Sequence, residues 1–167
     1  MFRSKWFIWC LALAVLCGAT SCTYKYKCPE DGQLKAKSKS EMVAAEHGFT
    51  VVEDVPLTEC KASDLELVPF LQSEDGGRIG GETLRKRAVT LKSNLGLMDA
   101  KRLLDNQSEI PIEFRGKVLV FTGTFLRDSD GSLHVSCLYG NGDRWCLSFY
   151  WIDNDFGDNS RLLRCKS

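Results

Sequence analysis

The chain has few of the residues from which most metal centres are built. It holds only two histidines, His47 and His134, and none of its eight cysteines stands in a Cys-x-x-Cys pair. Structural zinc sites need closely spaced cysteine and histidine ligands. The sequence therefore predicts no metal site and no cofactor.

An excess of either charge is also missing, because 22 Lys+Arg balance 22 Asp+Glu. Proteins that bind nucleic acid through their overall charge are strongly basic, so we expect no nucleic-acid partner. The hydrophobic share of 44% is high enough to build a core. That share excludes a chain that is disordered throughout.

The apolar run near the amino terminus is too short to cross a membrane. It covers residues 6–16, whereas a spanning helix needs about 20 residues. Arg3 and Lys5 precede the run, and small residues follow it up to Ser21. These features are typical of a signal peptide over residues 1–21. We expect a protein that is secreted or held in the cell envelope.

Residues 19–22, Ala-Thr-Ser-Cys, resemble a bacterial lipobox. The resemblance implies that Cys22 becomes the acylated first residue of the mature chain. Cleavage without acylation would instead leave a soluble product. Membrane attachment is therefore expected only if Cys22 carries a lipid.

Export makes disulfides possible for the six cysteines that follow the signal. Asn141-Gly142, read as a two-residue hairpin loop, places Cys137 opposite Cys146 in a non-hydrogen-bonded pair. Such pairs have Cα atoms about 4.5 Å apart, within the disulfide range. We predict the bridge Cys137–Cys146; the alternative is two reduced cysteines on one sheet face. A bridge from Cys165 to Cys60 or to Cys28 would hold the last strand, and both remain open.

Four segments follow from composition and pattern. They are a signal peptide (1–21), a tether with a short helix (22–47), an irregular segment with a short strand (48–81), and a helical pair with an antiparallel sheet (82–167). The short helix rests on the capping box Ser38-x-x-Glu41 and ends at Gly48.

Residues 82–106 have the clearest helical pattern. Apolar residues from Leu84 to Leu95 recur at helical spacing, Gly96 interrupts them, and a second apolar face continues from Leu97 to Leu104. Four β-prone runs follow, over 117–126, 133–139, 145–152 and 161–165. Their short connections predict an antiparallel meander. We expect the hairpin face that carries Leu138, Trp145, Leu147, Phe149 and Trp151 to pack against the helices.

The fold class is therefore predicted as α+β, with a helical pair on a small four-stranded antiparallel meander that disulfides stabilise. The order of a Gly-Lys-Val strand at 116–118, Gly123-Thr124, an Asp130-Gly131 turn and further strands is similar to OB-like modules of some bacterial envelope proteins. This resemblance covers about a third of the chain and implies a partial OB-like barrel.

Two groups of residues are candidates for binding. The first is the basic triplet Arg85, Lys86 and Arg87, which would suit an anionic partner such as a lipid headgroup, a glycan or an acidic protein. The second is an aromatic strip on the sheet that contains Tyr139, Trp145 and Trp151. Complementary charges within the fold and ordinary core packing are the alternative interpretations.

No nucleophile stands in a recognisable motif with a base. We therefore expect an exported, non-enzymatic module that binds a protein, a glycan or an envelope surface. One alternative is a small extracytoplasmic hydrolase whose carboxylates, among them Glu66, Asp75, Glu82 and Glu113, converge in space. Another is a structural envelope lipoprotein with an acylated Cys22.

Overall fold

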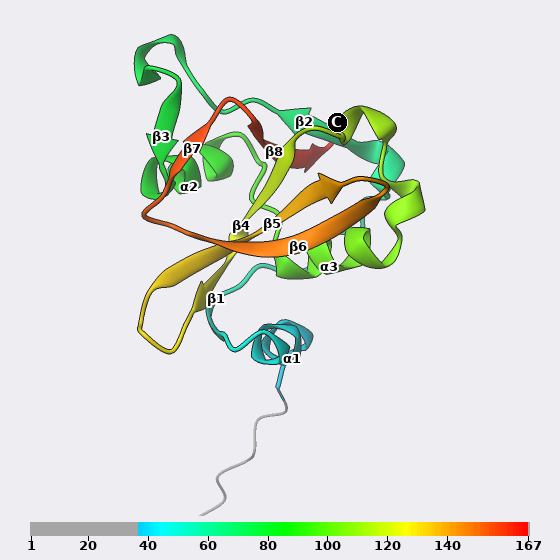
Figure 1. Ribbon diagram of the computed structural model, residues 1–167, viewed down its shortest axis with the longest axis vertical. Helices are drawn as coiled ribbons and strands as arrows, with labels where there is room; N and C mark the ends of the chain where they lie inside the picture. The colour runs from blue at the N-terminus through cyan, green and yellow to red at the C-terminus, as the bar shows by residue number, and fades with distance from the viewer. Residues whose placement is uncertain (1–36, 167) are drawn as a thin grey trace, which may run out of the picture. The chain divides into compact units, whose positions relative to one another are not determined.

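The computed structural model describes residues 37–166. The predicted signal peptide, the lipidation site Cys22 and Cys28 lie outside these residues. Within them the fold is α+β, with three α-helices, a mixed six-stranded sheet and a two-stranded sheet (Figure 1). No helix in this part of the chain has the length and hydropathy to cross a membrane.

The three helices lie where the local patterns predict them. They are α1 (Lys39–Glu46), α2 (Gly81–Thr90) and α3 (Leu97–Asp105). Helix α1 begins with the predicted capping box, because Ser38 Oγ accepts from the Glu41 amide while Glu41 accepts from the Ser38 amide. The predicted helical pair is confirmed as α2 and α3, with Gly96 at the N-cap of α3.

A buried carboxylate holds the first turn of α3. Asp99 is fully buried and accepts hydrogen bonds from the Gly96 amide at 3.1 Å and from the hydroxyl of Thr58 at 2.6 Å. The amide of Thr58 and the guanidinium of Arg102 complete its contacts. Asp99 therefore joins α3 to the segment that leads to Cys60.

The sheet contains strands from both halves of the chain. Its strands are β1 (Thr50–Glu53), β2 (Leu65–Val68), β4 (Val118–Arg127), β5 (Leu133–Asn141), β6 (Arg144–Trp151) and β8 (Ser160–Cys165), while β3 (Arg78–Gly80) and β7 (Asp155–Gly157) form the small second sheet. The order is β2-β8-β4-β5-β6, and β1 pairs with β4. All four strands predicted after residue 112 are present.

Their predicted arrangement as one antiparallel meander is wrong for the last strand. Strands β4, β5 and β6 form the meander, but β8 lies on the other side of β4 and runs parallel to it. The intervening β7 leaves the main sheet to pair with β3, so the chain returns beside β4. Leu162 and Leu163 in β8 are both fully buried, which requires cover on both faces of the strand. The described strands form an open sheet and no closed barrel.

A bulge in β4 accommodates the connection between α2 and α3. The register of β4 against β5 shifts between Phe121 and Leu126. Within this stretch the Gly123 amide donates to the carbonyl of Leu95 at 2.8 Å. A Cβ atom on Gly123 would lie 2.2 Å from the carbonyl oxygen of Asn94, so only glycine allows this approach.

The two faces of the sheet bury separate cores. One core joins α3 to Leu119, Phe121, Leu138 and Trp145. The other joins α2 and β7 to Val120, Val135, Cys137 and Leu162. Leu147 lies at the margin of the first core, and Phe149 packs against a third cluster of Ala44, Leu97 and Leu126. The predicted packing of this hairpin face against helices is therefore confirmed except for Trp151, which is 55% exposed.

One disulfide, Cys60–Cys165, is present in the described residues, with Cα atoms 5.9 Å apart. It resolves the choice left open for Cys165. Disulfides are typical of proteins from non-reducing, exported compartments.

The predicted bridge Cys137–Cys146 is wrong, because both cysteines are free. The loop is Gly142-Asp143 rather than Asn141-Gly142, since Asn141 pairs with Arg144. Gly142 has φ of +59° and Asp143 keeps a negative φ, as in a type II′ turn. The changed register places Cys137 opposite Ser148 and Cys146 opposite Tyr139.

Candidate functional site

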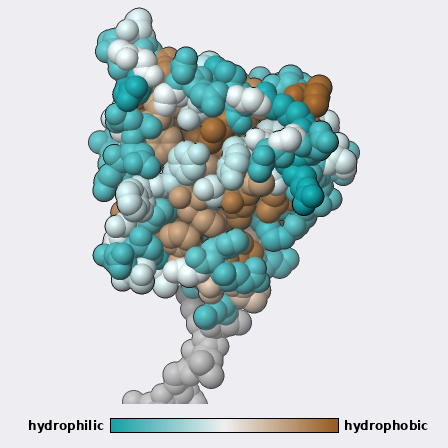
Figure 2. Space-filling model, in the orientation of Figure 1, coloured by the Kyte–Doolittle hydropathy of each residue, from teal (hydrophilic) through white to brown (hydrophobic). Residues whose placement is uncertain are grey.

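The most distinctive surface of the molecule is the free edge of β6. Among the described strands, β6 ends the sheet order and pairs only with β5. It lies at the front of the view in Figure 1, with no other strand beside its outer edge. Figure 2, in the same orientation, shows hydrophobic and weakly polar residues across the middle of this face, framed by hydrophilic residues.

The hairpin turn determines which backbone groups of β6 face outward. Asn141 and Arg144 flank a two-residue loop and so form a hydrogen-bonded pair, after which bonded and non-bonded pairs alternate. The outward positions are therefore Trp145, Leu147, Phe149 and Trp151. Two hydrogen bonds agree with this alternation. The amide of Trp145 points away from β5 and donates to Gln107, whereas the amide of Ile152 points toward β5 and donates to Leu133.

The side chains of β6 make its edge unusually apolar. From Trp145 to Ile152 there is no charged residue. Leu147 is half-buried at the margin of the α3 core, and Phe149 is half-buried against the cluster of Ala44, Leu97 and Leu126. Trp151 is 55% exposed. Long apolar edge strands are normally blocked by charges, proline or bulges because they pair readily with other chains. The edge of β6 lacks these protections.

An aromatic cluster continues this surface from Phe149 toward α1. Phe149 contacts Phe49 with ring centroids 4.6 Å apart, and His47 at 5.0 Å. His134 contacts Phe49 at 5.0 Å and Trp151 at 6.0 Å. Both histidines of the chain therefore lie in one cluster, although 87 residues separate them in sequence.

His134 has an acidic neighbour at the inner side of this cluster. Its Nε2 lies 3.8 Å from the carboxylate of Asp128, and its Nδ1 lies 3.3 Å from the carbonyl of Ser132. The imidazole is nearly buried. No cysteine or serine nucleophile is hydrogen-bonded to this histidine among residues 37–166, so the arrangement orients a ring rather than activating a nucleophile.

The structure does not bring the three predicted basic residues together as one free surface. Arg85 pairs with Glu53 and lies 4.6 Å from the ring centroid of Phe125. Arg87 forms an ion pair with Asp75, and the hydrogen bonds of this pair lower the pKa of the Asp75 carboxyl and raise that of Arg87. Lys86 is exposed. The two arginines thus serve the fold, and of the three predicted basic residues only Lys86 has no ion-pair partner among the described residues.

The three residues of the predicted aromatic strip also do not form one surface. Trp145 is buried in the α3 core, 3% exposed. Tyr139 pairs with Cys146 on the opposite face. Trp151 is the exposed member. Sequence reasoning missed Leu147, Ser148 and Phe149 as site residues, because the predicted meander placed the strand at 161–165 along this edge, whereas β8 lies beside β4.

Two ionisable groups near β6, the thiol of Cys137 and the phenol of Tyr150, have raised pKa values. Burial raises the pKa of the Cys137 thiol well above its ordinary value. The pKa of Tyr150 is also raised, chiefly by burial and further by Cys137 and Tyr139. Neither side chain is therefore ionised near neutral pH, and the surface is uncharged along the strand.

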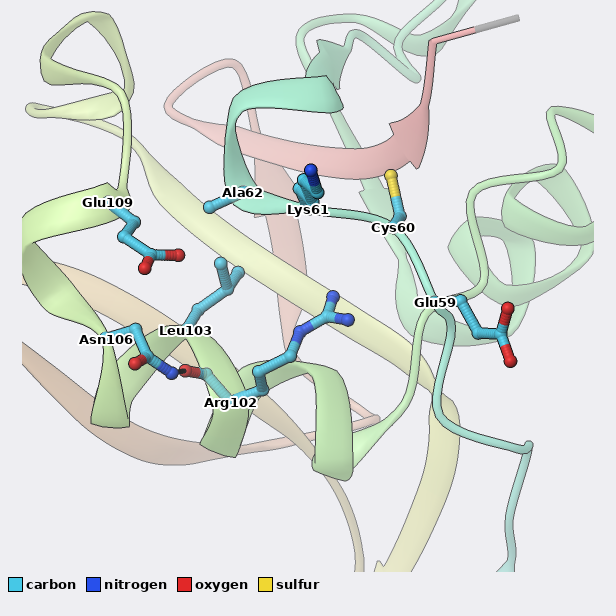
Figure 3. Close-up of a pocket in the computed structure, with 8 residues that line it drawn as sticks. All are labelled: Glu59, Cys60, Lys61, Ala62, Arg102, Leu103, Asn106 and Glu109. Carbon is cyan, nitrogen blue, oxygen red and sulfur yellow. Dashed lines mark hydrogen bonds between the residues drawn. The ribbon is translucent and has the colours of Figure 1, made fainter.

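One hollow lies next to the disulfide, between α3 and the segment before β2. Its volume is about 260 Å³, and its lining consists of Glu59, Cys60, Lys61, Ala62, Arg102, Leu103, Asn106 and Glu109 (Figure 3). Arg102 reaches from α3 toward this segment and donates to the Thr58 carbonyl at 2.6 Å. The lining contains no histidine or serine. Its acidic and basic side chains balance, and the cationic group that reaches into it already has protein partners.

The carboxylates of the hydrolase hypothesis also have separate partners. Glu66 pairs with Arg164, and Asp75 pairs with Arg87. No hydrogen bond or ion pair joins any two of the four predicted carboxylates within residues 37–166. In the same part of the chain, no three His, Cys, Asp or Glu side chains form a group that could hold a metal ion.

Comparisons with protein-family models, with curated proteins and with solved structures find no match to this chain. The geometry of β6 and its aromatic neighbours is therefore the main basis for a functional proposal.

Proposed function

We propose that the protein is an exported, non-enzymatic interaction module that binds another polypeptide by accepting it as an added strand along β6. The observation that carries the proposal is the open edge of β6, which is eight residues long and uncharged between Trp145 and Trp151. Strand addition gives affinity through main-chain hydrogen bonds and specificity through alternate side chains.

The surroundings of the edge support this mode of binding. An incoming strand would meet Leu147, Phe149 and Trp151 on the α3 side, with Cys146, Ser148 and Tyr150 on the other. Trp151 offers a large exposed ring, and aromatic residues are enriched where proteins bind one another. The aromatic cluster around Phe49 supports Phe149 from behind.

The test removes an outward amide without disturbing the ladder to β5. Phe149→Pro deletes one of the N–H groups that face away from β5, a place where an edge strand tolerates proline. Phe149→Leu keeps the amide and changes the side chain. Leu67→Pro is the matched control, because Leu67 has its amide on the outer edge of β2, between the bonded pairs Glu66–Arg164 and Val68–Leu162.

The probe is a displayed library of random octapeptides selected on the full chain, with affinities then measured by calorimetry. We expect selected peptides to bind the wild type, Phe149→Leu and Leu67→Pro, and to lose at least about tenfold in affinity for Phe149→Pro, since one lost hydrogen bond with an unpaired acceptor costs about 1–3 kcal/mol. Equal binding to Phe149→Pro, or no enrichment on a chain that sediments as a monomer, would refute the proposal.

A further inference from the structure

The outward backbone groups of β6 form a defined set. Alternation leaves three amides, of Leu147, Phe149 and Trp151, and three carbonyls, of Trp145, Leu147 and Phe149, without a hydrogen-bond partner among the described residues. The set is uniform in spacing, because each member is two residues from the next.

Both ends of this set are closed by the chain itself. The Trp145 amide donates to Gln107 Oε1 at 2.7 Å. The carbonyl of Trp151 accepts from the Asn154 amide at 3.1 Å. The Trp145 amide and the Trp151 carbonyl therefore already have partners. The Trp145 carbonyl and the Trp151 amide have none among the described residues.

From this pattern we infer that the strand that β6 accepts is β6 of a second copy of the chain, in an antiparallel pair with its two-fold axis at Ser148. The inference rests on the proposed function, because it names the partner of the same edge. In this register Leu147 lies opposite Phe149 of the second copy, and Trp145 lies opposite its Trp151.

The register satisfies every free group. Leu147 and Phe149 exchange two hydrogen bonds with their opposites, which the two-fold axis doubles to four. The Trp151 amide of each copy donates to the free carbonyl of Trp145 in the other, which adds two. The remaining two groups of that outer pair, the Trp145 amide and the Trp151 carbonyl, are those that Gln107 and Asn154 already hold.

Other pairings fit less well. A shift of the register by two residues in either direction leaves one donor and one acceptor of each copy without a partner. An unrelated peptide would satisfy the six groups of β6, but its own residues opposite Trp145 and Trp151 would direct a carbonyl and an amide at groups that are already bonded. In a second copy, the Trp145 amide already donates to Gln107 and the Trp151 carbonyl already accepts from Asn154, so neither group is left without a partner.

Charge also favours the antiparallel copy. At the start of β6 lie Arg144, Asp143 and Arg115, whose guanidinium donates to the carbonyls of the turn, so this end is net positive. Beyond its other end lie Asp153 and the pair Arg78–Asp155, so that end is net negative. An antiparallel pair brings each positive end to a negative end, whereas a parallel pair would bring like charges together. The stretch between them carries no charge.

The two-fold axis makes Ser148 a sensitive test position. Ser148 lies opposite itself in a non-hydrogen-bonded pair, in which Cα atoms are about 4.5 Å apart. A charge placed there meets the same charge on the second copy, and like charges directly across a strand pair are destabilising. Opposite charges on two variants should instead attract.

The experiment uses Ser148→Lys and Ser148→Glu in the full chain, with Ser129→Lys and Ser129→Glu as controls in the exposed β4–β5 turn. Sedimentation equilibrium should show a dimer for the wild type and both controls. Each Ser148 variant alone should self-associate at least about tenfold more weakly, a change of about 1.4 kcal/mol, because like charges this close at a protein surface repel by more than that amount. An equimolar mixture of the two variants should recover the dimer.

The possible results separate this inference from the proposed function. A wild type that stays monomeric but binds selected peptides in a Phe149-dependent way overturns the second copy and keeps strand addition. A monomer that also binds no peptide overturns both. A dimer that both Ser148 variants retain refutes the axis proposed here.

Cross-linking provides a second, independent measurement. In a background with Cys137→Ala and Cys146→Ser, which removes the thiols near position 148, Ser148→Cys should form a disulfide-linked dimer under mild oxidation, since self-opposed non-bonded positions fall within the disulfide range. Leu147→Cys in the same background should not, because it lies opposite Phe149. Equal cross-linking of both, or none for Ser148→Cys, would contradict the register.

Discussion

The two end strands of the main sheet, β2 and β6, differ in how well they are protected from pairing with another chain. Strand β2 at one edge is four residues long, carries the Glu66–Arg164 ion pair to β8, and is held by the Cys60–Cys165 disulfide beside it. Strand β6 at the other edge is eight residues long, uncharged in its middle and free of any bulge. A short charged edge resists pairing with other chains, and a long apolar edge invites it.

The difference shows where the stabilising contacts of this fold lie. The disulfide, the buried Asp99 cluster and the Glu66–Arg164 ion pair lie around the segment that leads into β2 and around the last strand β8. Among the described residues, only two hydrogen bonds reach the outer side of β6: the Trp145 amide donates to Gln107, and the Asn154 amide donates to the Trp151 carbonyl. Four changes should sharpen this contrast, from the largest expected effect on stability to the smallest.

Removal of the disulfide should have the largest effect. Cys60→Ala together with Cys165→Ala opens a loop with a sequence separation of 105 residues. The chain-entropy model assigns about 3–5 kcal/mol to a loop of this length. Urea unfolding with and without reductant measures the loss, and Cys146→Ser serves as the control because that cysteine is free. A loss no larger than that of the control would show that β2 is held by other contacts.

Truncation of Asp99 should come second. Asp99→Ala removes the acceptor of the Gly96 amide and of the Thr58 amide and hydroxyl, and leaves Arg102 without its carboxylate. Buried donors left unpaired cost about 1–3 kcal/mol each, with partial relaxation, so we expect a total loss of about 2–4 kcal/mol. Asp105→Ala, in the exposed Lys101 pair of the same helix, should cost less than about 0.5 kcal/mol by the same urea measurement.

Neutralisation of Glu66 should have a small effect. Its pair with Arg164 is more than a third exposed on both sides, and exposed pairs contribute about 0–1 kcal/mol. Glu66→Gln should therefore lower the unfolding free energy by less than about 1 kcal/mol, and 1 M salt should reduce the difference further. A larger loss that salt does not change would indicate that this edge depends on the pair.

A charge on the open edge should matter least to the folded monomer. In the Ser148→Lys background, where no dimer contributes, Trp151→Lys changes a side chain that is 55% exposed. The expected change is within about 0.5 kcal/mol. Thermal unfolding measures it, with Trp145→Lys as the contrasting change in a buried position. Comparable losses for the two tryptophans would mean that Trp151 supports the fold rather than a partner.

Local patterns in the sequence were sufficient for most elements of the fold. The capping box at Ser38, the interruption at Gly96 and the alternating runs after residue 112 predicted α1, the α2–α3 pair and four strands. They missed β2, β3 and β7, which are three or four residues long. Each of these strands exists only because a partner distant in sequence provides its hydrogen bonds, and no local window contains that information.

The candidate site was predictable only in outline. The aromatic residues of β6 drew attention to the correct hairpin, but the position of each was decided by what covers it. Trp145 is buried against Ile110 and Phe114, while Trp151 lies beyond the covered part of the strand. Arg85 and Arg87 are paired with Glu53 and Asp75, which lie 32 and 12 residues earlier in the chain.

The sequence by itself determined the fold class, the helices and the first three strands of the meander, since helix caps, turn residues and hydrophobic periodicity act over a few neighbouring residues. Tertiary structure alone decided that Cys165 pairs with Cys60, that Gly142-Asp143 forms the turn, and that β8 lies beside β4. These choices depend on the burial of Leu162 and Leu163 and on long-range strand pairing. The same pairing places β6 at the end of the sheet, where its outer backbone groups are left for a second strand.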